Sequence, residues 1–148
     1  LPMIPYIGHS TSLIYVVPVD YIYRAAVYLS EIEEAKGKTV HLTDPNPHPV
    51  QEVYRAFVKE ITGKTPRGHI PLSLAQASLS IHAIRKKLGV EYESLDYLTW
   101  NANFDTTVAN KLLKNSGIEC ADFIKSIPIM IKYYEENKHN KDFHIEIR

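Results

Sequence analysis

The chain has 148 residues and a mass of 16.9 kDa, which fits one domain. Lys and Arg together number 17, as do Asp and Glu, so the zero formal net charge gives no overall attraction for nucleic acid or an anionic membrane. Apolar residues make up 45% and charged residues 23%, a balance typical of globular domains that excludes a disordered tail.

The N-terminal part of the chain predicts a strand and then a helix. Residues 13–17 are β-branched, aromatic or leucine and lie between a serine and a proline, which is typical of a short buried strand. From Val19 onward apolar residues recur at the spacing of one helix face, which predicts a helix that ends near Ser30. Asp20 lies in the first turn of that helix, where a carboxylate faces free backbone N–H groups.

A second short strand is predicted over residues 39–43. The six residues that follow it contain three prolines, which prevent a strand ladder from continuing. Two short strands do not make a stable sheet by themselves. We therefore expect either a small core built by helices or a strand that belongs to a sheet supplied by other polypeptide.

Apolar residues at helical spacing predict four further helices, over residues 50–61, 73–88, 106–113 and 122–137. Gly63 is expected to end the first of these, and Pro128 either kinks the last one or marks its true start. The expected fold class is thus a mostly helical α/β fragment with about five helices and two short strands.

Two short motifs match known catalytic patterns only in part. Gly63-Lys64-Thr65 resembles the end of a phosphate-binding loop, yet it follows a helix and lacks that loop's first glycine, so we interpret it as a helix stop. Tyr134 and Lys138 have the spacing of the Tyr/Lys pair of short-chain dehydrogenases, but this spacing is common at the end of any helix. The six scattered glycines form no dinucleotide-binding loop.

The histidines and the single cysteine indicate neither a metal site nor a nucleophile. Of seven histidines, none pairs with another His or a Cys at helical ligand spacing, apart from His139 and His144 in the tail. Cys120 lacks an internal disulfide partner, and its acidic neighbours Glu119 and Asp122 disfavour the thiolate. We expect an unreactive thiol and a cytoplasmic protein, without a membrane span, because no apolar run approaches the ~20 residues that cross a bilayer.

Asp44 and Asn46 directly follow the predicted strand at residues 39–43. In open α/β sheets, ligands bind outside the carboxyl ends of the strands, so these side chains are candidates for a binding site. The alternative is that Asp and Asn only shape the turn, as they often do. The residues by themselves leave both interpretations open.

Three stretches of the chain form a combined pattern. Residues 16–22 read Val-Val-Pro-Val-Asp-Tyr-Ile, residues 37–45 read Gly-Lys-Thr-Val-His-Leu-Thr-Asp-Pro, and residues 104–118 begin with Phe-Asp-Thr-Thr and end with Gly-Ile. Together they resemble the C-terminal part of extended short-chain dehydrogenases/reductases, within the NAD-dependent epimerase/dehydratase superfamily. The resemblance is closest to the branch of fatty-acyl and thioester reductases, the male sterility type.

The resemblance implies that residues 1–148 are a single C-terminal substrate-binding domain of a parent about twice as long. In this family the dinucleotide-binding loop and the catalytic Ser/Thr, Tyr and Lys precede the Val-Pro-Val-Asp-Tyr motif, so we expect the chain alone to bind no cofactor and to catalyse nothing. NAD(P) is implied for the parent. Residues 39–43 would then be a strand that completes its Rossmann-type sheet.

The resemblance implies that the substrate is an acyl thioester or a similar carbonyl compound. The expected substrate-binding residues are Val17, Asp20, Asp44 and Asn46. For Asp20 the resemblance suggests chiefly a structural role, in which its carboxylate accepts hydrogen bonds at the start of the helix.

Two other functions are compatible with the sequence. Nucleotide-sugar epimerases and dehydratases hold a diphosphate with arginines, whereas here the first basic residue, Arg24, follows the motif and residues 91–105 contain no Arg or Lys. The other alternative is a free-standing helical protein-interaction module. The expected partners are a small-molecule substrate, the parent's nucleotide-binding domain and, through the unpaired edge of residues 39–43, a second copy of the chain, but no nucleic acid.

Overall fold

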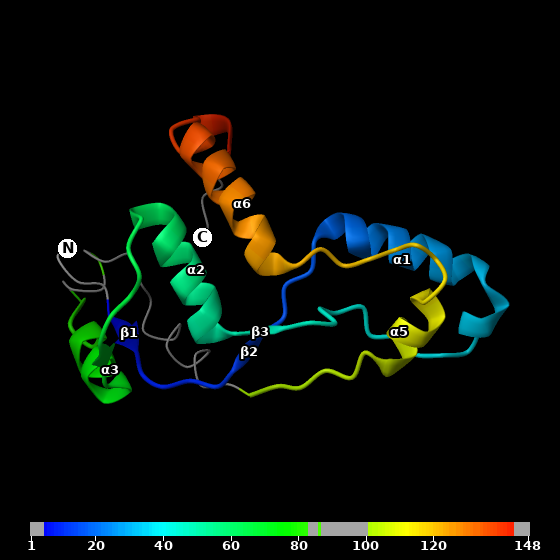
Figure 1. Cartoon of the computed structure of the whole chain (residues 1–148), viewed down its shortest axis with the longest axis horizontal. Helices are drawn as coiled ribbons and strands as arrows, with labels where there is room; N and C mark the ends of the chain where they lie inside the picture. Colours follow the sequence, from blue (N-terminus) through cyan, green and yellow to red (C-terminus); the bar gives the residue numbers. More distant parts are fainter. Residues whose placement is uncertain (1–4, 83–85, 87–100, 144–148) are drawn as a thin grey trace.

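The chain folds into a mostly helical α/β structure, seen in a computed structural model that describes residues 5–82, 86 and 101–143. This described part contains five α-helices and four two-residue strands, which pair into two small sheets (Figure 1). The elements are, in order, β1 (Tyr6–Ile7), β2 (Leu13–Ile14), α1 (Val19–Glu31), β3 (His48–Pro49), α2 (Val50–Thr62), β4 (His69–Ile70), α3 (Leu72–Leu79), α5 (Thr107–Leu113) and α6 (Phe123–Asn137). Short 3₁₀ turns cover Glu33–Ala35 and Lys141–Phe143. The expected fold class is confirmed.

The helix ends follow local signals in the sequence. Gly63 takes a left-handed conformation with φ 68°, and its N–H donates to the Lys59 carbonyl oxygen at 2.8 Å, so it ends α2 as predicted. Asp122 caps α6, because its carboxylate accepts a hydrogen bond from the backbone N–H of Lys125 at 3.0 Å. Pro128 therefore lies inside α6 and does not mark its start.

Helix α3 is shorter than predicted. It ends at Leu79, and Ser80 and Ile81 are not helical, so the expected continuous helix over residues 73–88 is wrong at this point. Hydroxyl groups contribute to the break, since those of Ser78 and Ser80 donate to the backbone carbonyls of Ala75 and Ala77. The rest of that prediction, at residues 83–85 and 87–88, lies outside the described residues.

The strand predicted at residues 39–43 is wrong. Residues 39–42 have no regular structure, and β2 pairs instead with β3 in an antiparallel register that joins Leu13 to Pro49 and Ile14 to His48. Pro49 lacks an N–H, but the next residue supplies one, since the Val50 N–H donates to the Ser12 carbonyl oxygen at 2.9 Å. The first predicted strand also shrinks, from residues 13–17 to β2 alone.

The second small sheet joins distant parts of the chain. Its two strands, β1 and β4, are parallel and pair Tyr6 with His69 and Ile7 with Ile70. Both strands are only two residues long, and the alternating or β-branched runs that predict strands are absent from them. Sequence patterning therefore missed this sheet.

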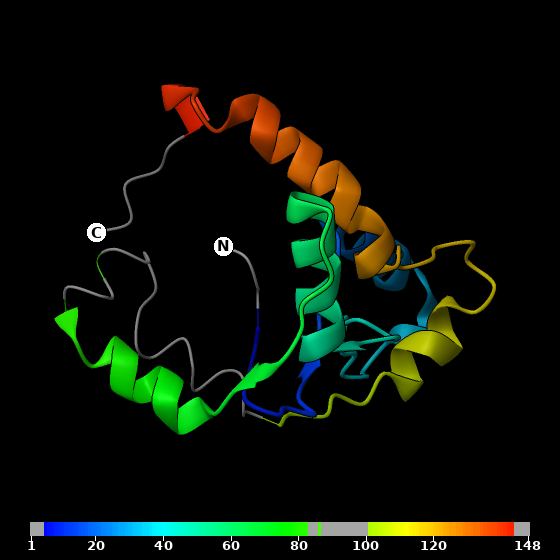
Figure 2. The same cartoon turned by 60° about the vertical axis from the view of Figure 1, so that its left-hand side comes forward.

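The helices fall into three groups along the molecule. Helices α1 and α5 lie at one end, α2 and α6 pack together in the middle, and α3 lies with β1 and β4 at the other end (Figures 1 and 2). A core cluster of Tyr21, Ala25 and Leu113 joins α1 to α5, and a smaller one of Ala75 and Leu79 lies on α3. The apolar core is thus divided rather than continuous.

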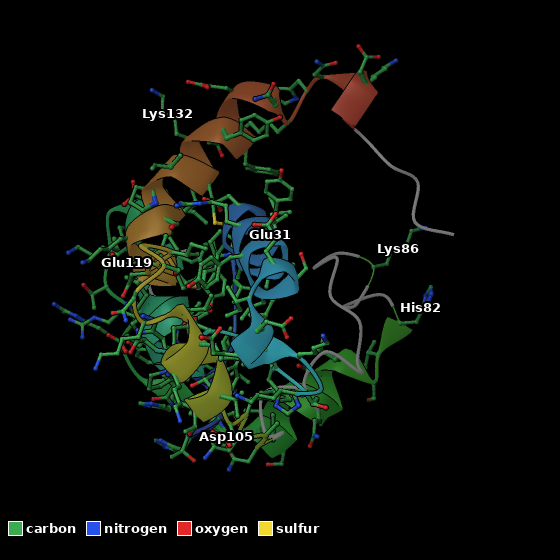
Figure 3. All side chains as sticks on the ribbon, turned by 90° about the vertical axis from the view of Figure 1, so that its right-hand side faces the viewer. Glu31, His82, Lys86, Asp105, Glu119 and Lys132 are labelled. Carbon is green, nitrogen blue, oxygen red and sulfur yellow. The ribbon has the colours of Figure 1, made fainter. Side chains whose placement is uncertain are left out.

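Much apolar surface stays in contact with solvent. Among the described residues, large apolar side chains that are exposed include Val19 (82% exposed), Ile129 (73%) and Tyr134 (63%). Charged side chains share the surface, and Figure 3 shows Lys132 projecting outward from α6. Such an apolar surface is typical of a chain that packs against another body.

Candidate functional site

A pocket of about 430 Å³ lies beside the α1–α5 core and is called here the α1–α5 pocket. Four parts of the chain form its wall: α1, the turn at residues 44–46, α5, and the loop between α5 and α6. Its lining residues are Tyr21, Pro45, Asn46, Asn110, Leu113, Lys114, Ile118, Glu119 and Cys120. The size is within the range of small-molecule sites in proteins.

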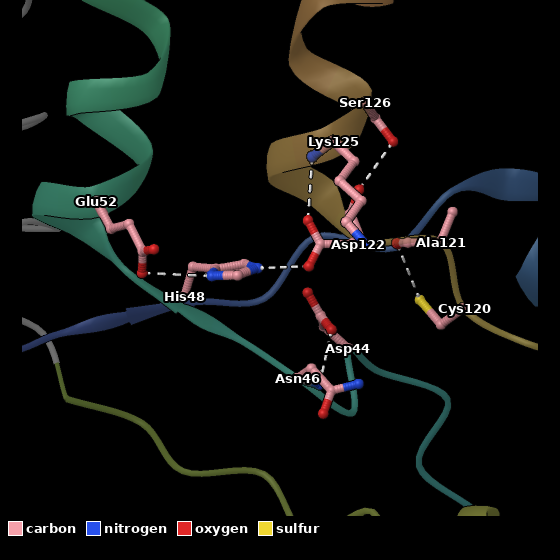
Figure 4. A network of polar contacts seen from close by, with 9 residues as sticks. All are labelled: Asp44, Asn46, His48, Glu52, Cys120, Ala121, Asp122, Lys125 and Ser126. Atoms are coloured by element: carbon pink, nitrogen blue, oxygen red, sulfur yellow. Dashed lines mark hydrogen bonds and ion pairs between the residues drawn. The ribbon is translucent and has the colours of Figure 1, made fainter.

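Asp44 is a buried carboxylate behind this wall. The residue is 4% exposed, and its Oδ1 accepts a hydrogen bond from the backbone N–H of Asn46 at 2.9 Å. Its Oδ2 is fully enclosed and has no hydrogen-bond donor within the described part of the chain. Figure 4 shows this oxygen pointing toward the carboxylate of Asp122. A buried carboxylate with a free oxygen is costly unless a positive or hydrogen-bonding group compensates it.

Cys120 contributes a thiol to the pocket wall. Burial is the main cause that raises the pKa of this thiol to about 11, and the negative charges of Asp44 and Asp20 raise it further. Its Sγ donates weakly to the Ala121 carbonyl oxygen at 3.8 Å. The raised pKa supports the expected unreactive thiol, and its causes are burial first and then Asp44 and Asp20, rather than the sequence neighbours Glu119 and Asp122.

Tyr21 is almost fully buried, and its ring packs in the α1–α5 core. Burial raises the pKa of its hydroxyl above the usual value, and the nearby Cys120 and Asp44 raise it further. The hydroxyl is therefore protonated at neutral pH. It can donate or accept a hydrogen bond, but it is not an activated base.

The four expected substrate-binding residues lie around this one region. Asn46 lines the pocket, and Asp44 lies directly behind it. Val17 packs against the core cluster of Tyr21, Ala25 and Leu113 and is absent from the pocket lining.

Asp20 is exposed in the first turn of α1 and acts on Cys120 through its charge. No side-chain cap forms at the start of α1, because the N-cap residue is Pro18 and Asp20 lies one position beyond the first helical residue. The expected role of Asp20 as a hydrogen-bond acceptor stays a prediction.

Sequence reasoning missed Tyr21, Asn110, Lys114 and Cys120 as pocket residues. None of them stands in a short catalytic motif, and they come from segments far apart in the chain. The one signal that could have grouped them is the resemblance to the reductase family. The three stretches that carry this resemblance contain or adjoin all the lining residues.

A second polar cluster links α2 to α6. His48 lies between two carboxylates, with its Nδ1 3.4 Å from Glu52 Oε2 and its Nε2 3.2 Å from Asp122 Oδ2 (Figure 4). A neutral imidazole carries one N–H, so only the imidazolium donates to both partners at once. The pKa of Asp122 is lowered, first by the N–H of Lys125 and then by His48. The cluster therefore connects the N-terminal ends of the two helices through polar contacts of His48.

Beside this link, α2 and α6 form a groove of about 370 Å³, called here the α2–α6 groove. Its apolar residues are Ala56, Ile124, Ile127 and Pro128, and its charged residues are Glu52, Arg55, Lys59 and Glu60.

The Tyr134–Lys138 pair lies at the C-terminal end of α6 and lines neither cavity. Lys138 forms an ion pair and hydrogen bond with Glu135, and this bond is the main cause that raises the pKa of its ammonium. Tyr134 is 63% exposed. This arrangement supports the interpretation that the spacing of the pair is a property of the helix and not of a catalytic site.

Two further properties of the described residues are their capacity to hold a metal ion and their capacity to cross a membrane. Across residues 5–82, 86 and 101–143, no group of three or more His, Cys, Asp or Glu side chains is arranged to hold a metal ion. None of the helices in this described part has both the length and the apolar character that crossing a bilayer requires.

Comparison of the chain with models of protein families, with curated proteins and with solved structures found no match.

Proposed function

We propose that this chain is the substrate-binding part of an NAD(P)-dependent extended short-chain reductase that acts on an acyl thioester or a similar carbonyl compound. The observation that carries the proposal is the α1–α5 pocket. Its lining comes from the three stretches that resemble this family, at residues 16–22, 37–45 and 104–118, and from residues next to them. Segments that are far apart in the sequence thus meet around one cavity, whose size suits a small-molecule ligand.

The exposed apolar surface supports a second part of the proposal, that the parent's nucleotide-binding domain covers this chain. The divided core and the exposed apolar side chains of the described residues fit a chain that completes its packing against another domain.

In the proposed enzyme the chemistry is divided between the two parts. NAD(P)H supplies the hydride, and a tyrosine of the nucleotide-binding part, assisted by a lysine, protonates the carbonyl oxygen. This chain contributes the pocket that holds the acyl group. The proposed location is the cytoplasm, where a reduced Cys120 is expected.

The test begins with the open reading frame upstream of Leu1. We expect it to encode, in frame, a Gly-x-x-Gly-x-x-Gly loop and a Tyr-x-x-x-Lys pair. The whole product should oxidise NADPH when an acyl thioester is added, while residues 1–148 alone should neither bind NADPH nor turn over. Tight NADPH binding by residues 1–148, or a start codon beside Leu1, would contradict the proposal.

The nucleotide-sugar alternative has less support from the pocket. A diphosphate is held best by bidentate arginines, but Lys114 is the one cation among the lining residues. Binding of a UDP-sugar by the whole product, measured by calorimetry, would favour this alternative.

The α2–α6 groove favours a different second candidate, a helical protein-interaction module. Its lining combines apolar with charged residues, a composition that suits a surface receiving an amphipathic partner helix. Light scattering distinguishes the two ideas: a stable monomer favours the module, whereas a chain separated from its parent domain should self-associate. The dimer that we expected through residues 39–43 has lost its basis, since no strand edge forms there.

A further inference from the structure

Two segments in the wall of the α1–α5 pocket belong to no helix or strand. One is the turn at residues 44–46, and the other is the loop at residues 118–122 between α5 and α6. Both contribute side chains to the lining. Because no backbone ladder joins these segments, side-chain contacts decide how the turn lies beside the loop.

His48 connects the turn to the loop. It lies two residues after Asn46, which lines the pocket. Its Nε2 is 3.2 Å from Oδ2 of Asp122, which lies two residues after the lining residue Cys120 (Figure 4). Within the described part of the chain, this is the one hydrogen bond between these two regions. The side chains of His48 and Asp122 are 20% and 33% exposed, so water screens the contact only in part.

The groups that face the imidazole of His48 are mostly acidic. On its other side, the Nδ1 atom lies 3.4 Å from Oε2 of Glu52, in the first turn of α2. At the start of α6, Asp122 also accepts a hydrogen bond from the backbone N–H of Lys125, whose positive charge acts on the same carboxylate. The turn adds the enclosed oxygen of Asp44, which points toward Asp122 (Figure 4). Strand β2, which pairs with β3, adds no charged side chain.

The protonation state of His48 decides how strongly it holds these partners. The imidazolium donates to Glu52 and Asp122 at once, whereas the neutral ring divides a single N–H between two carboxylates and turns a lone pair toward one of them. A hydrogen bond from a charged donor is also about twice as strong as one between neutral groups. Histidine changes between the two forms at about pH 5–8. The contact between turn and loop should therefore weaken as the pH rises through this range.

Three other groups near the contact keep their protonation state in this range. Burial is the main cause that raises the pKa of the Cys120 thiol to about 11, and it also raises the pKa of the Tyr21 hydroxyl, so both stay protonated. A backbone hydrogen bond is the main cause that lowers the pKa of Asp122, which stays ionised.

We propose that His48 is a positioning residue of the α1–α5 pocket: as the imidazolium it fastens the turn to the loop, and as the neutral imidazole it holds the loop more weakly. The pocket is therefore better formed at pH 6 than at pH 8 and binds its ligand more tightly there. The inference rests on the proposed function for the choice of an acyl thioester as the ligand, whereas the positioning of the wall follows from the contacts of His48.

The first measurement follows the wall itself, by NMR of the 148-residue chain between pH 5.5 and pH 8. The ring protons of His48 give the pH at which the imidazole changes its charge. We expect the backbone amides of Glu119 and Cys120 to shift with the same midpoint, and their ¹⁵N relaxation to show greater motion above it.

The second measurement follows the ligand. The butanoyl thioester of N-acetylcysteamine has no group that titrates in this range, so any pH dependence of its binding comes from the protein. We expect it to bind about threefold more tightly at pH 6 than at pH 8, an effect of the size that a partly exposed ion pair gives.

Variants test whether His48 is the source of both effects. His48→Gln keeps a neutral hydrogen-bonding side chain and removes the titration, so the loop amides should no longer shift and binding should be equal at the two pH values. His82→Gln is the matched control, because His82 is exposed and lines neither the α1–α5 pocket nor the α2–α6 groove (Figure 3), and both effects should persist in it.

A second variant keeps the proposal testable should His48→Gln fail to fold. Glu52 is 55% exposed, and Glu52→Gln removes one of the two carboxylates that share the imidazole. The neutral ring can then direct its single N–H to Asp122, so the difference in binding between pH 6 and pH 8 should shrink to less than about twofold.

The outcomes separate this inference from the proposed function. Loop amides that do not follow the midpoint of His48, or that still titrate in His48→Gln, overturn the positioning role, as does equal or tighter binding of the probe at pH 8. Loop amides that follow His48 while the probe binds at neither pH support the positioning role and contradict the proposed ligand. NADPH oxidation by the whole product with the same probe reports on the reductase separately.

Discussion

The α1–α5 end and the α2–α6 pair are held together in different ways. At the α1–α5 end, Tyr21, Ala25 and Leu113 form a buried cluster around which seven half-buried residues pack, and one carboxylate, Asp44, is enclosed beside it. Between α2 and α6, Ile127 is fully buried, but a groove stays open and His48 links the helix starts. Apolar packing thus encloses a carboxyl group at one end, whereas a polar link accompanies the apolar contact of α2 with α6 in the middle.

The difference matters for function. A side chain that is enclosed beside a packed cluster, as Asp44 is, keeps its position. An open groove with a polar link can adjust to a partner surface. Four experiments sharpen or break this comparison, in order of decreasing expected effect.

The largest effect is expected from Ile127→Ala. This side chain is 1% exposed and lies between α6 and α2, so its truncation should lower the free energy of unfolding by about 2–5 kcal/mol. Ile129→Ala on the same helix is the matched control, because Ile129 is 73% exposed, and it should cost about 0.5 kcal/mol or less. Urea unfolding followed by circular dichroism measures both. Equal effects would mean that α6 does not pack on α2 as described.

The next effect concerns Cys120. With a pKa of about 11, the thiolate fraction at pH 8 is on the order of one in a thousand, so a disulfide reagent should react about a hundredfold more slowly than with free cysteine. The same chain in urea should react at the ordinary rate. Asp44→Asn should speed the reaction modestly, since burial is the larger cause of the shift. A fast reaction in the folded chain would show that the wall is open.

Overpacking tests the α1–α5 cluster. Ala25 is fully buried at the contact of α1 with α5, so Ala25→Leu should lower the free energy of unfolding by about 1–3 kcal/mol. Ala26→Leu introduces the same side chain at an exposed position of the same helix and should be nearly neutral. Thermal unfolding compares the two variants. A neutral Ala25→Leu would indicate unfilled space in this cluster.

The smallest effect tests the polar link. Asp122→Ala removes the cap of α6 and a partner of His48, and should cost about 1 kcal/mol at pH 7. The folded-state pKa of Asp122 is lowered, so its contribution is present above the unfolded pKa and is lost as the pH falls through the folded pKa. The difference from the unchanged chain should therefore shrink as the solution is acidified below the ordinary pKa of an aspartate. Asp20→Ala, a first-turn acid without a cap bond, is the control; a pH-independent difference would contradict the assignment.

Local features were predicted well because their causes are local. The stop of α2 at Gly63 needs only a residue that tolerates positive φ, and the start of α6 needs only an acid three residues before a free N–H. The prediction of a strand at residues 39–43 was wrong because a strand forms only beside a partner strand, and no sequence pattern states which partner strand is present. Pro49 is predicted to break a strand, yet it pairs with Leu13 in β3. A ladder of two residues tolerates its missing N–H, because so short a ladder needs few hydrogen bonds.

The sequence by itself determined most helix positions, the fold class and the candidacy of Asp44 and Asn46, because backbone preference and apolar spacing act within a few residues. Only the tertiary structure decided that Asp44 is enclosed, that it raises the pKa values of Tyr21 and Cys120, and that one cavity joins α1 to α5. The physical reason is that burial and electrostatic fields depend on distance in space, and residues far apart in the chain provide both.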